Sequence, residues 1–164
     1  LLFSSAGKSI RFKESDVRSV GRTAIGVRGI RLADKDKVVS LIVAESDDPI
    51  LTATEKGYGK RTQLDEYRAQ ARGGSGVISI KTSDRNGQVV GAIQVTDEDE
   101  MMLISDKGTL VRARAADVSI IGRNTQGVTL INIADDEALV SVAKIAETDD
   151  DEEGTEEVEV KSEE

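Results

Sequence analysis

The stretch GKSIRFKESDVRSVGRTAIGVRGI, from Gly7 to Ile30, is the first of three similar repeats in this chain. Further copies begin at Gly57 and Gly108, and neither needs a gap to align with the first. Equivalent positions are Arg11, Arg61 and Arg112; Val17, Tyr67 and Val118; Arg22, Arg72 and Arg123; and Gly26, Gly76 and Gly127, each glycine followed by valine. A regular period of about 50 residues is typical of propellers and repeat arrays rather than of single-core enzymes.

The composition excludes several kinds of site. The 164 residues include no cysteine and no histidine, which excludes disulfides, thiolate metal sites, Ser-His or Cys-His catalysis and most transition-metal sites. The lack of cysteine suits a reducing compartment. No apolar run reaches the roughly 18 residues of a membrane helix, and no signal peptide is recognisable. Because the first residue is Leu1 rather than Met, we expect a piece of a longer protein.

The net charge of −9 comes from the end of the chain. Residues 147–164 hold 11 acidic side chains against Lys161 alone, whereas residues 1–146 hold 21 basic and 20 acidic side chains. Such an acidic run repels itself and builds no core. The sequence therefore predicts a nearly neutral globular part and a disordered acidic tail at 148–164.

Each repeat shows the pattern of short strands. Residues 9–13 alternate between apolar and polar side chains, as a half-buried strand does. We expect further strands at 1–4, 27–32 and 38–43, with a long connection at 14–26. In the second repeat, Asn86-Gly87 lies between apolar runs at 77–81 and 89–95, which predicts a hairpin. The third repeat has the same order, at 102–104, 109–114, 128–133 and 139–145.

Four strands per repeat is the count for one propeller-type blade. We therefore expect an all-β fold of antiparallel four-stranded blades at 1–49, 50–100 and 101–147, followed by the tail. The apolar positions are assigned to blade cores built from Val, Ile, Leu and Ala, because aromatic residues are scarce.

Charge follows the repeat. The aligned windows 7–31, 57–81 and 108–132 hold 15 basic and 5 acidic residues, whereas the rest of residues 1–146 holds 6 basic and 15 acidic ones. We expect an outward strand face with Arg11, Lys13, Arg61, Arg112 and Arg114, and adjoining loops with Arg18, Arg22, Arg68, Arg72 and Arg123. A basic band of this kind indicates a polyanion partner. Without a recognition helix or an aromatic stacking platform, duplex DNA held by its backbone fits best. The alternative is a charged face that only keeps the protein soluble.

Several motifs in order carry a family resemblance. Residues 10–18 approximate VRFKESxVR, residues 26–32 read GVRGIRL, residues 57–62 read GYGKRT, and residues 122–128 read GRNTQGV. Over residues 1 to about 146 the chain resembles the C-terminal domain of the A subunit of bacterial DNA gyrase. The resemblance implies a β-pinwheel, a propeller-like ring of about six blades whose basic perimeter wraps duplex DNA. This chain would hold the last three blades.

The resemblance also implies a role in a larger enzyme. The parent would be an ATP-hydrolysing type II topoisomerase that introduces negative supercoils, with ATP and Mg²⁺ bound elsewhere in the complex and no cofactor in this chain. Its partners would be double-stranded DNA, the rest of the gyrase A protein, and the gyrase B protein in an A2B2 heterotetramer, with no membrane. Its location would be the bacterial cytoplasm, associated with the nucleoid.

The candidate DNA-binding residues are all basic, and no residue is assigned to catalysis or to a metal. They are Lys8, Arg11, Lys13, Arg18, Arg22, Arg28, Lys60, Arg61, Arg68, Arg72, Arg112, Arg114 and Arg123.

Two departures from the family pattern stand out. The family's box QRRGGKG belongs to its first blade, and here residues 70–76 (QARGGSG) match five of its seven positions. We interpret them as a degenerate copy in which Arg72 still contacts phosphate. The catalytic tyrosine and its neighbouring arginine have no counterpart, so Tyr58 and Tyr67 are assigned structural roles.

Three alternatives stay open at this point. The first is the C-terminal ring of the A-type subunit of topoisomerase IV. The second is a protein-interaction module such as a WD40 or chromosome-condensation-regulator propeller, although the chain has no tryptophan. The third is a free-standing enzyme, for which no nucleophile–base pair is present.

Overall fold

The computed structural model describes residues 1–145, so the predicted tail at 148–164 and the end of the third repeat lie outside the described residues. The first repeat forms β1 (Leu2–Ser4), β2 (Lys8–Ile10) and β3 (Val38–Leu41). The second forms β4 (Ile50–Thr54), β5 (Tyr58–Thr62), β6 (Val77–Ile78) and β7 (Val89–Gln94). The third forms β8 (Glu100–Ser105), β9 (Leu110–Arg114), β10 (Val128–Thr129) and β11 (Leu139–Lys144). Short 3₁₀ helices follow β2, β5 and β9, at Glu14–Asp16 (η1), Leu64–Glu66 (η2) and Ala115–Asp117 (η3).

The strands form three antiparallel sheets. The second and third repeats each place one strand in the sheet of the preceding repeat, an arrangement that we call strand exchange. The sheet orders are β3-β1-β2-β6, β10-β5-β4-β7 and β11-β8-β9. Thus β6 of the second repeat completes the sheet of the first, and β10 of the third completes the sheet of the second. The all-β prediction is confirmed, but the expectation that each repeat builds its blade from its own four strands is corrected.

Strand exchange explains two local differences from the sequence-based expectations. Residues 27–32 form no strand, because their equivalents pair with the sheet of the preceding repeat and residues 1–145 contain no such sheet. The predicted Asn86-Gly87 hairpin is also wrong, since β6 and β7 belong to different sheets. The side-chain amide of Asn86 is buried and donates to the carbonyl oxygens of Lys81 and Gln126, 2.8 and 3.0 Å away.

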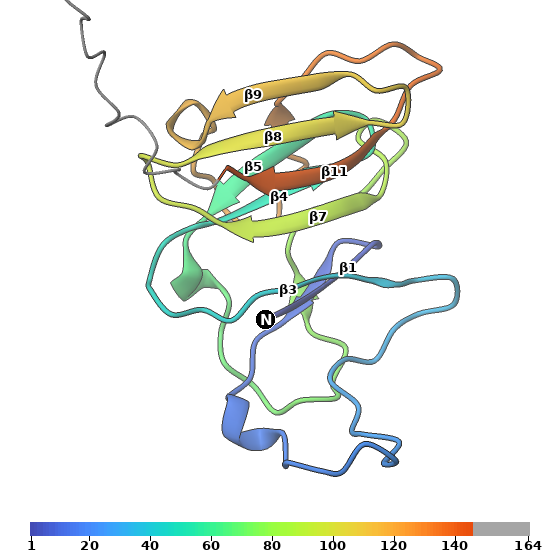
Figure 1. Ribbon diagram of the computed structural model, residues 1–164, viewed down its shortest axis with the longest axis vertical. Coiled ribbons are helices and arrows are strands. Elements are labelled where there is room, and N and C mark those ends of the chain that lie inside the picture. Colours follow the sequence, from blue (N-terminus) through green and yellow to red (C-terminus); the bar gives the residue numbers. More distant parts are fainter. Residues whose placement is uncertain (146–164) are drawn as a thin grey trace, which may run out of the picture.

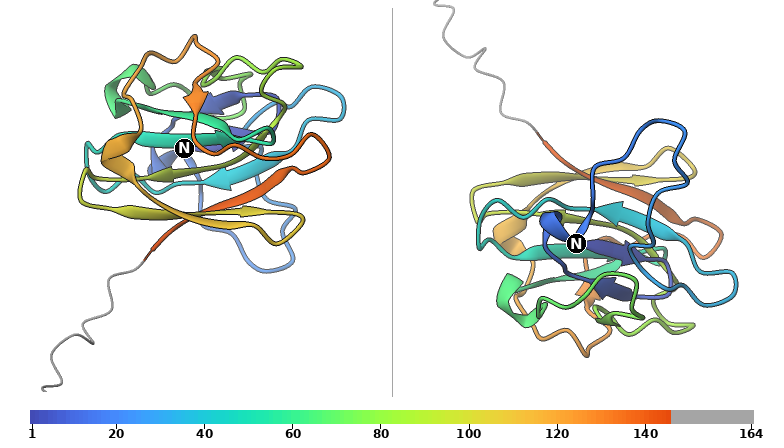
Figure 2. Two further views of the ribbon diagram at one scale, coloured as in Figure 1. Left: turned by 90° about the horizontal axis from the view of Figure 1, so that it is seen from above. Right: turned by 90° about the horizontal axis from the view of Figure 1, so that it is seen from below.

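The sheets pack side by side through one set of edges. Strand β7 contacts both β3 and β11, so these three strands lie close together, as Figures 1 and 2 show. The opposite edges of the first two sheets carry the exchanged strands β6 and β10.

Two hydrophobic clusters fill the spaces between repeats. One joins the first two repeats and is centred on Phe3, Ile50 and Tyr67. The other joins the second and third and includes Leu51, Met101 and Leu103 among its buried members. Because each cluster draws side chains from two consecutive repeats, the repeats stabilise one another rather than standing as separate cores.

Candidate nucleic-acid interface

The arginines on the second strand of each repeat connect neighbouring repeats. The Arg61 side chain is 5% exposed, and its Nε donates to the carbonyl oxygen of Val118 at 2.8 Å. Its Nη1 pairs with the carboxylate of Asp97. One repeat earlier, Arg11 Nη1 donates to the carbonyl oxygen of Tyr67 at 3.3 Å. Each arginine therefore braces the backbone just after the 3₁₀ helix of the following repeat.

These contacts correct the expectation of one outward face with Arg11, Arg61 and Arg112. Arg61 is buried and Arg11 is half-buried, whereas Arg112 is exposed and pairs with Glu100 on the adjacent strand β8. The alternating pattern identifies a strand correctly but gives no information about what covers its edge. Here the following repeat covers the strand edge, through parallel bridges that join Arg11 to Ala69 and Arg61 to Ile120.

Lys60 also lies beneath the surface rather than on it. It is fully buried, and its Nζ donates to the carbonyl oxygen of Gly122 at 2.7 Å and to Thr125 Oγ1 at 3.1 Å. Burial lowers the pKa of this ammonium from 10.5 to about 8; the Glu66 carboxylate opposes the shift and Arg123 adds to it. Lys60 thus holds the loop at 122–125 in place, and its predicted position on an exposed basic surface is wrong.

A second repeated brace uses the arginines of the loops. Arg72 Nη1 donates to the carbonyl oxygen of Arg28 at 3.1 Å, and Arg72 Nε donates to that of Asp16 at 2.9 Å. Arg123 Nη1 donates to the equivalent carbonyl of Ile78 at 2.8 Å. Both arginines are half-buried. The degenerate box at 70–76 therefore uses its arginine to hold the loop of the first repeat.

The exposed positive charge lies instead in three equivalent segments, at 17–31, 67–81 and 118–132, which we call the outer segments. Each follows a 3₁₀ helix, and the second and third contain the exchanged edge strands β6 and β10. Together they hold eight basic residues and no acidic residue. The basic residues are Arg18, Arg22, Arg28, Arg31, Arg68, Arg72, Lys81 and Arg123.

Six of these eight side chains belong to exposed residues, all except Arg72 and Arg123. Arg31 and Lys81 were absent from the candidates selected on sequence, although they occupy equivalent positions at the end of the repeated window. Among the other candidates, Lys13 is exposed and Lys8 is half-buried. Arg114 is exposed and lies 3.2 Å from the carboxylate of Asp117.

Negative charge gathers in the turns that connect one repeat to the next. These turns contain Glu45, Asp47 and Asp48 in the first case and Asp97, Glu98 and Asp99 in the second. Burial tends to raise the pKa of Asp99, but Lys144 Nζ and the amide of Thr96, each 2.7 Å away, donate to it and bring its pKa below the ordinary value. Acidic turns and basic outer segments thus occupy different parts of each repeat.

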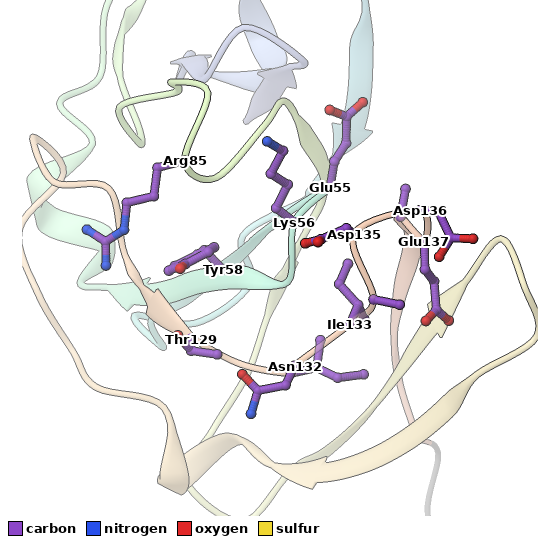
Figure 3. Close-up of a pocket in the computed structure, with 13 residues that line it drawn as sticks. Glu55, Lys56, Tyr58, Arg85, Thr129, Asn132, Ile133, Asp135, Asp136 and Glu137 are labelled. Carbon is purple, nitrogen blue, oxygen red and sulfur yellow. The ribbon is translucent and has the colours of Figure 1, made fainter.

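A groove of about 610 Å³ opens between the second and third repeats. Figure 3 shows Arg85 beside the ring of Tyr58, with Asp135, Asp136 and Glu137 farther along the groove. The guanidinium carbon of Arg85 lies 4.9 Å from the centre of the Tyr58 ring. Because carboxylates outnumber basic groups among the lining residues, this groove is not a polyanion site.

Within residues 1–145, no three carboxylate side chains converge on one point where they could hold a metal ion. No helix in the described part of the chain is both long and apolar enough to cross a bilayer.

Comparison with known proteins places these repeats in a family. Residues 1–45, 48–96 and 99–146 match the family described as DNA gyrase C-terminal domain, beta-propeller. The chain belongs to this family. The resemblance inferred from the repeated motifs is thereby confirmed, and the gyrase C-terminal family has the propeller-like β architecture that the repeats predict.

Individual relatives agree with this assignment. The DNA gyrase A protein of Klebsiella oxytoca is 61% identical over 153 residues, which are 93% of this chain and 18% of that protein. A solved DNA gyrase A C-terminal domain superposes with a TM-score of 0.83 at 32% identity, over 88% of this chain and 50% of that one. A solved C-terminal domain of DNA topoisomerase IV gives a TM-score of 0.81 at 26% identity, over 88% and 45%.

The relatives also help to choose between the gyrase assignment and the other proteins considered from the sequence. The chain spans less than a fifth of the length of the curated gyrase A relatives that it matches first. Their high identity supports the gyrase assignment over topoisomerase IV and over an unrelated interaction propeller.

Proposed function

We propose that this chain is the DNA-wrapping part of a gyrase A protein and that it holds duplex DNA along its outer segments. The observation that carries the proposal is the presence of eight basic and no acidic residues in these three segments. The segments follow one another at equivalent positions of consecutive repeats, so a duplex lying along them meets cations at regular intervals.

The chemistry of the outer segments favours backbone contacts with a duplex. Arginine and lysine neutralise phosphates and release condensed counterions, which gives affinity with little sequence preference. The single aromatic residue of the segments, Tyr67, is 1% exposed, so no base can stack on it. Bending 20–30 bp by 40–90° costs on the order of 1–6 kcal/mol, which several phosphate contacts can offset.

The density of charge falls along the chain. The first outer segment holds four basic residues, the second three and the third one. In the third, Arg123 also braces the carbonyl of Ile78. We infer that the first two segments provide most of the affinity and that the third mainly continues the path.

In the parent, this chain would present a DNA segment to the catalytic core of a type II topoisomerase. We infer that this enzyme is the ATP- and Mg²⁺-dependent A2B2 gyrase complex, acting in the bacterial cytoplasm at the nucleoid to introduce negative supercoils. The fragment itself would contribute binding and bending without catalytic residues.

A matched pair of variants tests the proposal. One variant removes four charges from the outer segments, as Arg18→Gln, Arg22→Gln, Arg28→Gln and Arg68→Gln. The control removes four exposed charges from turns at the strand ends, as Lys35→Gln, Lys37→Gln, Lys56→Gln and Lys107→Gln. Both change the net charge equally.

Binding to a duplex of about 30 bp is then measured across a salt series. The slope of log affinity against log salt is negative, and each lost phosphate contact brings it about 0.9 closer to zero. We expect the outer-segment variant to lose up to about four contacts and the control to keep the slope of the unmodified chain. Equal losses in the two variants would show that net charge, rather than the outer segments, governs binding.

A further inference from the structure

The outer segments contain little regular secondary structure of their own. Apart from the two-residue strands β6 and β10 and isolated bridges at Ala69 and Ile120, they consist of turns and irregular backbone. Duplex DNA is stiff, with a persistence length of about 150 bp. Loops that could shift relative to one another would therefore follow a straight duplex, whereas loops held at fixed positions can bend it.

Two backbone hydrogen bonds hold consecutive outer segments against each other. The amide of Arg31 in the first segment donates to the carbonyl oxygen of Gly74 in the second at 2.8 Å. The amide of Lys81 in the second donates to the carbonyl oxygen of Thr125 in the third, also at 2.8 Å. The donors occupy equivalent repeat positions, and so do the acceptors. Each outer segment thus meets the next one in the same way.

Arg72 spans the first outer segment from the second. Its Nε donates at 2.9 Å to the carbonyl oxygen of Asp16, the residue just before that segment. Its Nη1 donates at 3.1 Å to the carbonyl oxygen of Arg28, near the end of the segment. The planar guanidinium offers donors in a fixed fork, so one side chain sets the position of both parts of the neighbouring segment.

Arg123 spans the second outer segment from the third in the same manner. Its Nη1 donates to the carbonyl oxygen of Ile78 at 2.8 Å. Its Nε is buried and lies 3.9 Å from the carboxylate of Glu66, which also accepts from the Arg123 amide at 3.1 Å. Glu66 and Ile78 are the equivalents of Asp16 and Arg28. The brace therefore recurs at both junctions, between the same positions of the repeat.

These two arginines differ from the other arginines of the outer segments in how their charge is used. Both are half-buried, and their donors are directed at carbonyl oxygens of the preceding segment. The Arg123 side chain also lies beside the Glu66 carboxylate. In contrast, Arg18 and Arg68 are exposed. The sequence-based assignment of Arg72 to a phosphate contact does not fit a guanidinium that is engaged in this way.

We propose that Arg72 and Arg123 are positioning residues that fix the spacing of consecutive outer segments and thereby the bend of the bound duplex. This inference rests on the proposed function, because it divides one DNA interface into two sets of side chains. The exposed arginines provide phosphate contacts and set the affinity. The two bracing arginines set the shape of the surface on which the duplex lies.

A matched pair of double variants separates the two roles. The brace variant is Arg72→Gln/Arg123→Gln, and the contact variant is Arg18→Gln/Arg68→Gln. Each removes two positive charges from equivalent positions of two outer segments. Glutamine is too short to reach both partners of a brace, so the first variant loses the link between segments, whereas the second retains it.

Energy transfer between dyes at the two ends of a duplex measures the bend, and a salt series measures the contacts. The contact variant should bring the salt slope up to about 1.8 closer to zero and keep the energy transfer of the unmodified chain at saturation. The brace variant should change the slope by less than about 0.9, the value for one contact, and lower the energy transfer at saturation. Equal slope changes with unchanged energy transfer would show that Arg72 and Arg123 are ordinary phosphate contacts.

Amide hydrogen exchange without DNA tests the brace independently of binding. The amides of Arg31 and Lys81 should exchange faster in the brace variant, while the amides of β4 and β8 keep their protection because the cores are intact. The single variant Arg72→Gln, whose lost hydrogen bonds are exposed, repeats the measurements at the first junction should the double variant unfold. Unchanged exchange at Arg31 and Lys81 would overturn the positioning role. Binding that does not depend on salt would instead overturn the proposed function.

Discussion

Arg61 donates from Nε to the carbonyl oxygen of Val118 at 2.8 Å, across the junction between the second and third repeats. Arg11 makes the corresponding contact with Tyr67 across the first junction. Arginines at this repeat position are therefore joints between repeats. Arg112 meets no following repeat within residues 1–145 and pairs with Glu100 on the adjacent strand.

Replacing the buried Arg61 should destabilise the fold more than replacing the exposed Arg112. We expect Arg61→Leu to lower the free energy of unfolding by about 2–4 kcal/mol, because buried carbonyl oxygens lose their donor. Arg112→Leu removes only a surface ion pair and should cost less than about 1 kcal/mol. Urea denaturation of both variants measures the difference, and similar costs would contradict the assignment of Arg61 as a joint.

The exchanged strands depend on glycines that approach neighbouring backbone. Gly76 has a φ of +68°, and a Cβ there would lie 2.1 Å from the carbonyl oxygen of Ser9. We expect Gly76→Ala to cost more than about 2 kcal/mol, from left-handed strain plus this clash. Gly21 has no described atom within 4 Å of its Cβ position, so Gly21→Ala should change stability by less than about 0.5 kcal/mol. Equal thermal midpoints for the two variants would argue against strand exchange.

Lys60 should make stability depend on pH in the alkaline range. Its pKa is about 8 in the folded chain and 10.5 ordinarily, so the unfolded chain binds more protons between these values. Stability should therefore rise with pH through that window. Lys60→Met should remove this contribution, and the difference between the two pH profiles isolates it from other titrating groups.

Side-chain ¹⁵N spectra check the lowered pKa of Lys60 without unfolding the protein. The Lys60 ammonium should titrate near pH 8, well below the ordinary lysine value of 10.5. A Lys60 signal that titrates above pH 10, or identical pH profiles for the two proteins, would contradict the burial of this group.

Tyr67 fills the space between the first two repeats. Its ring meets Phe3 edge-on at 5.8 Å, and its hydroxyl lies 3.1 Å from Ser79 Oγ. We expect Tyr67→Phe to cost about 1 kcal/mol through the lost hydrogen bond. Tyr67→Val, which copies the residue of the other repeats, should cost about 2–4 kcal/mol through the cavity that it leaves. Tyr58→Phe serves as the control, since Tyr58 is half exposed, and a larger loss there would contradict the packing.

The repeat itself could be read from the sequence because equivalent residues recur without gaps. The period located the turns, most of the strands and the acidic connections, although the strand expected at 27–32 does not form. The charge count located the outer segments with Arg18, Arg22, Arg28 and Arg68. Arg31 and Lys81 could have been added by the same count, since they end the repeated window.

Strand exchange could not be read in the same way, because it is a non-local pairing. Alternation within residues 9–13 specifies a strand but does not specify that the next repeat covers its edge, and so Arg61 and Lys60 were expected at the surface. For the same reason Asn86-Gly87 was read as a hairpin between two runs that enter different sheets. The burial of Lys60 has no local signal, since its equivalents are Ile10 and Val111.

Backbone amide NMR during a titration with duplex DNA shows whether the duplex lies on the outer segments. We expect the shift changes to concentrate in residues 17–31 and 67–81, to continue weakly into 118–132, and to spare the acidic turns at 45–48 and 97–99. Changes centred on those turns, or on the strand-end turns at 33–37 and 106–108, would contradict it.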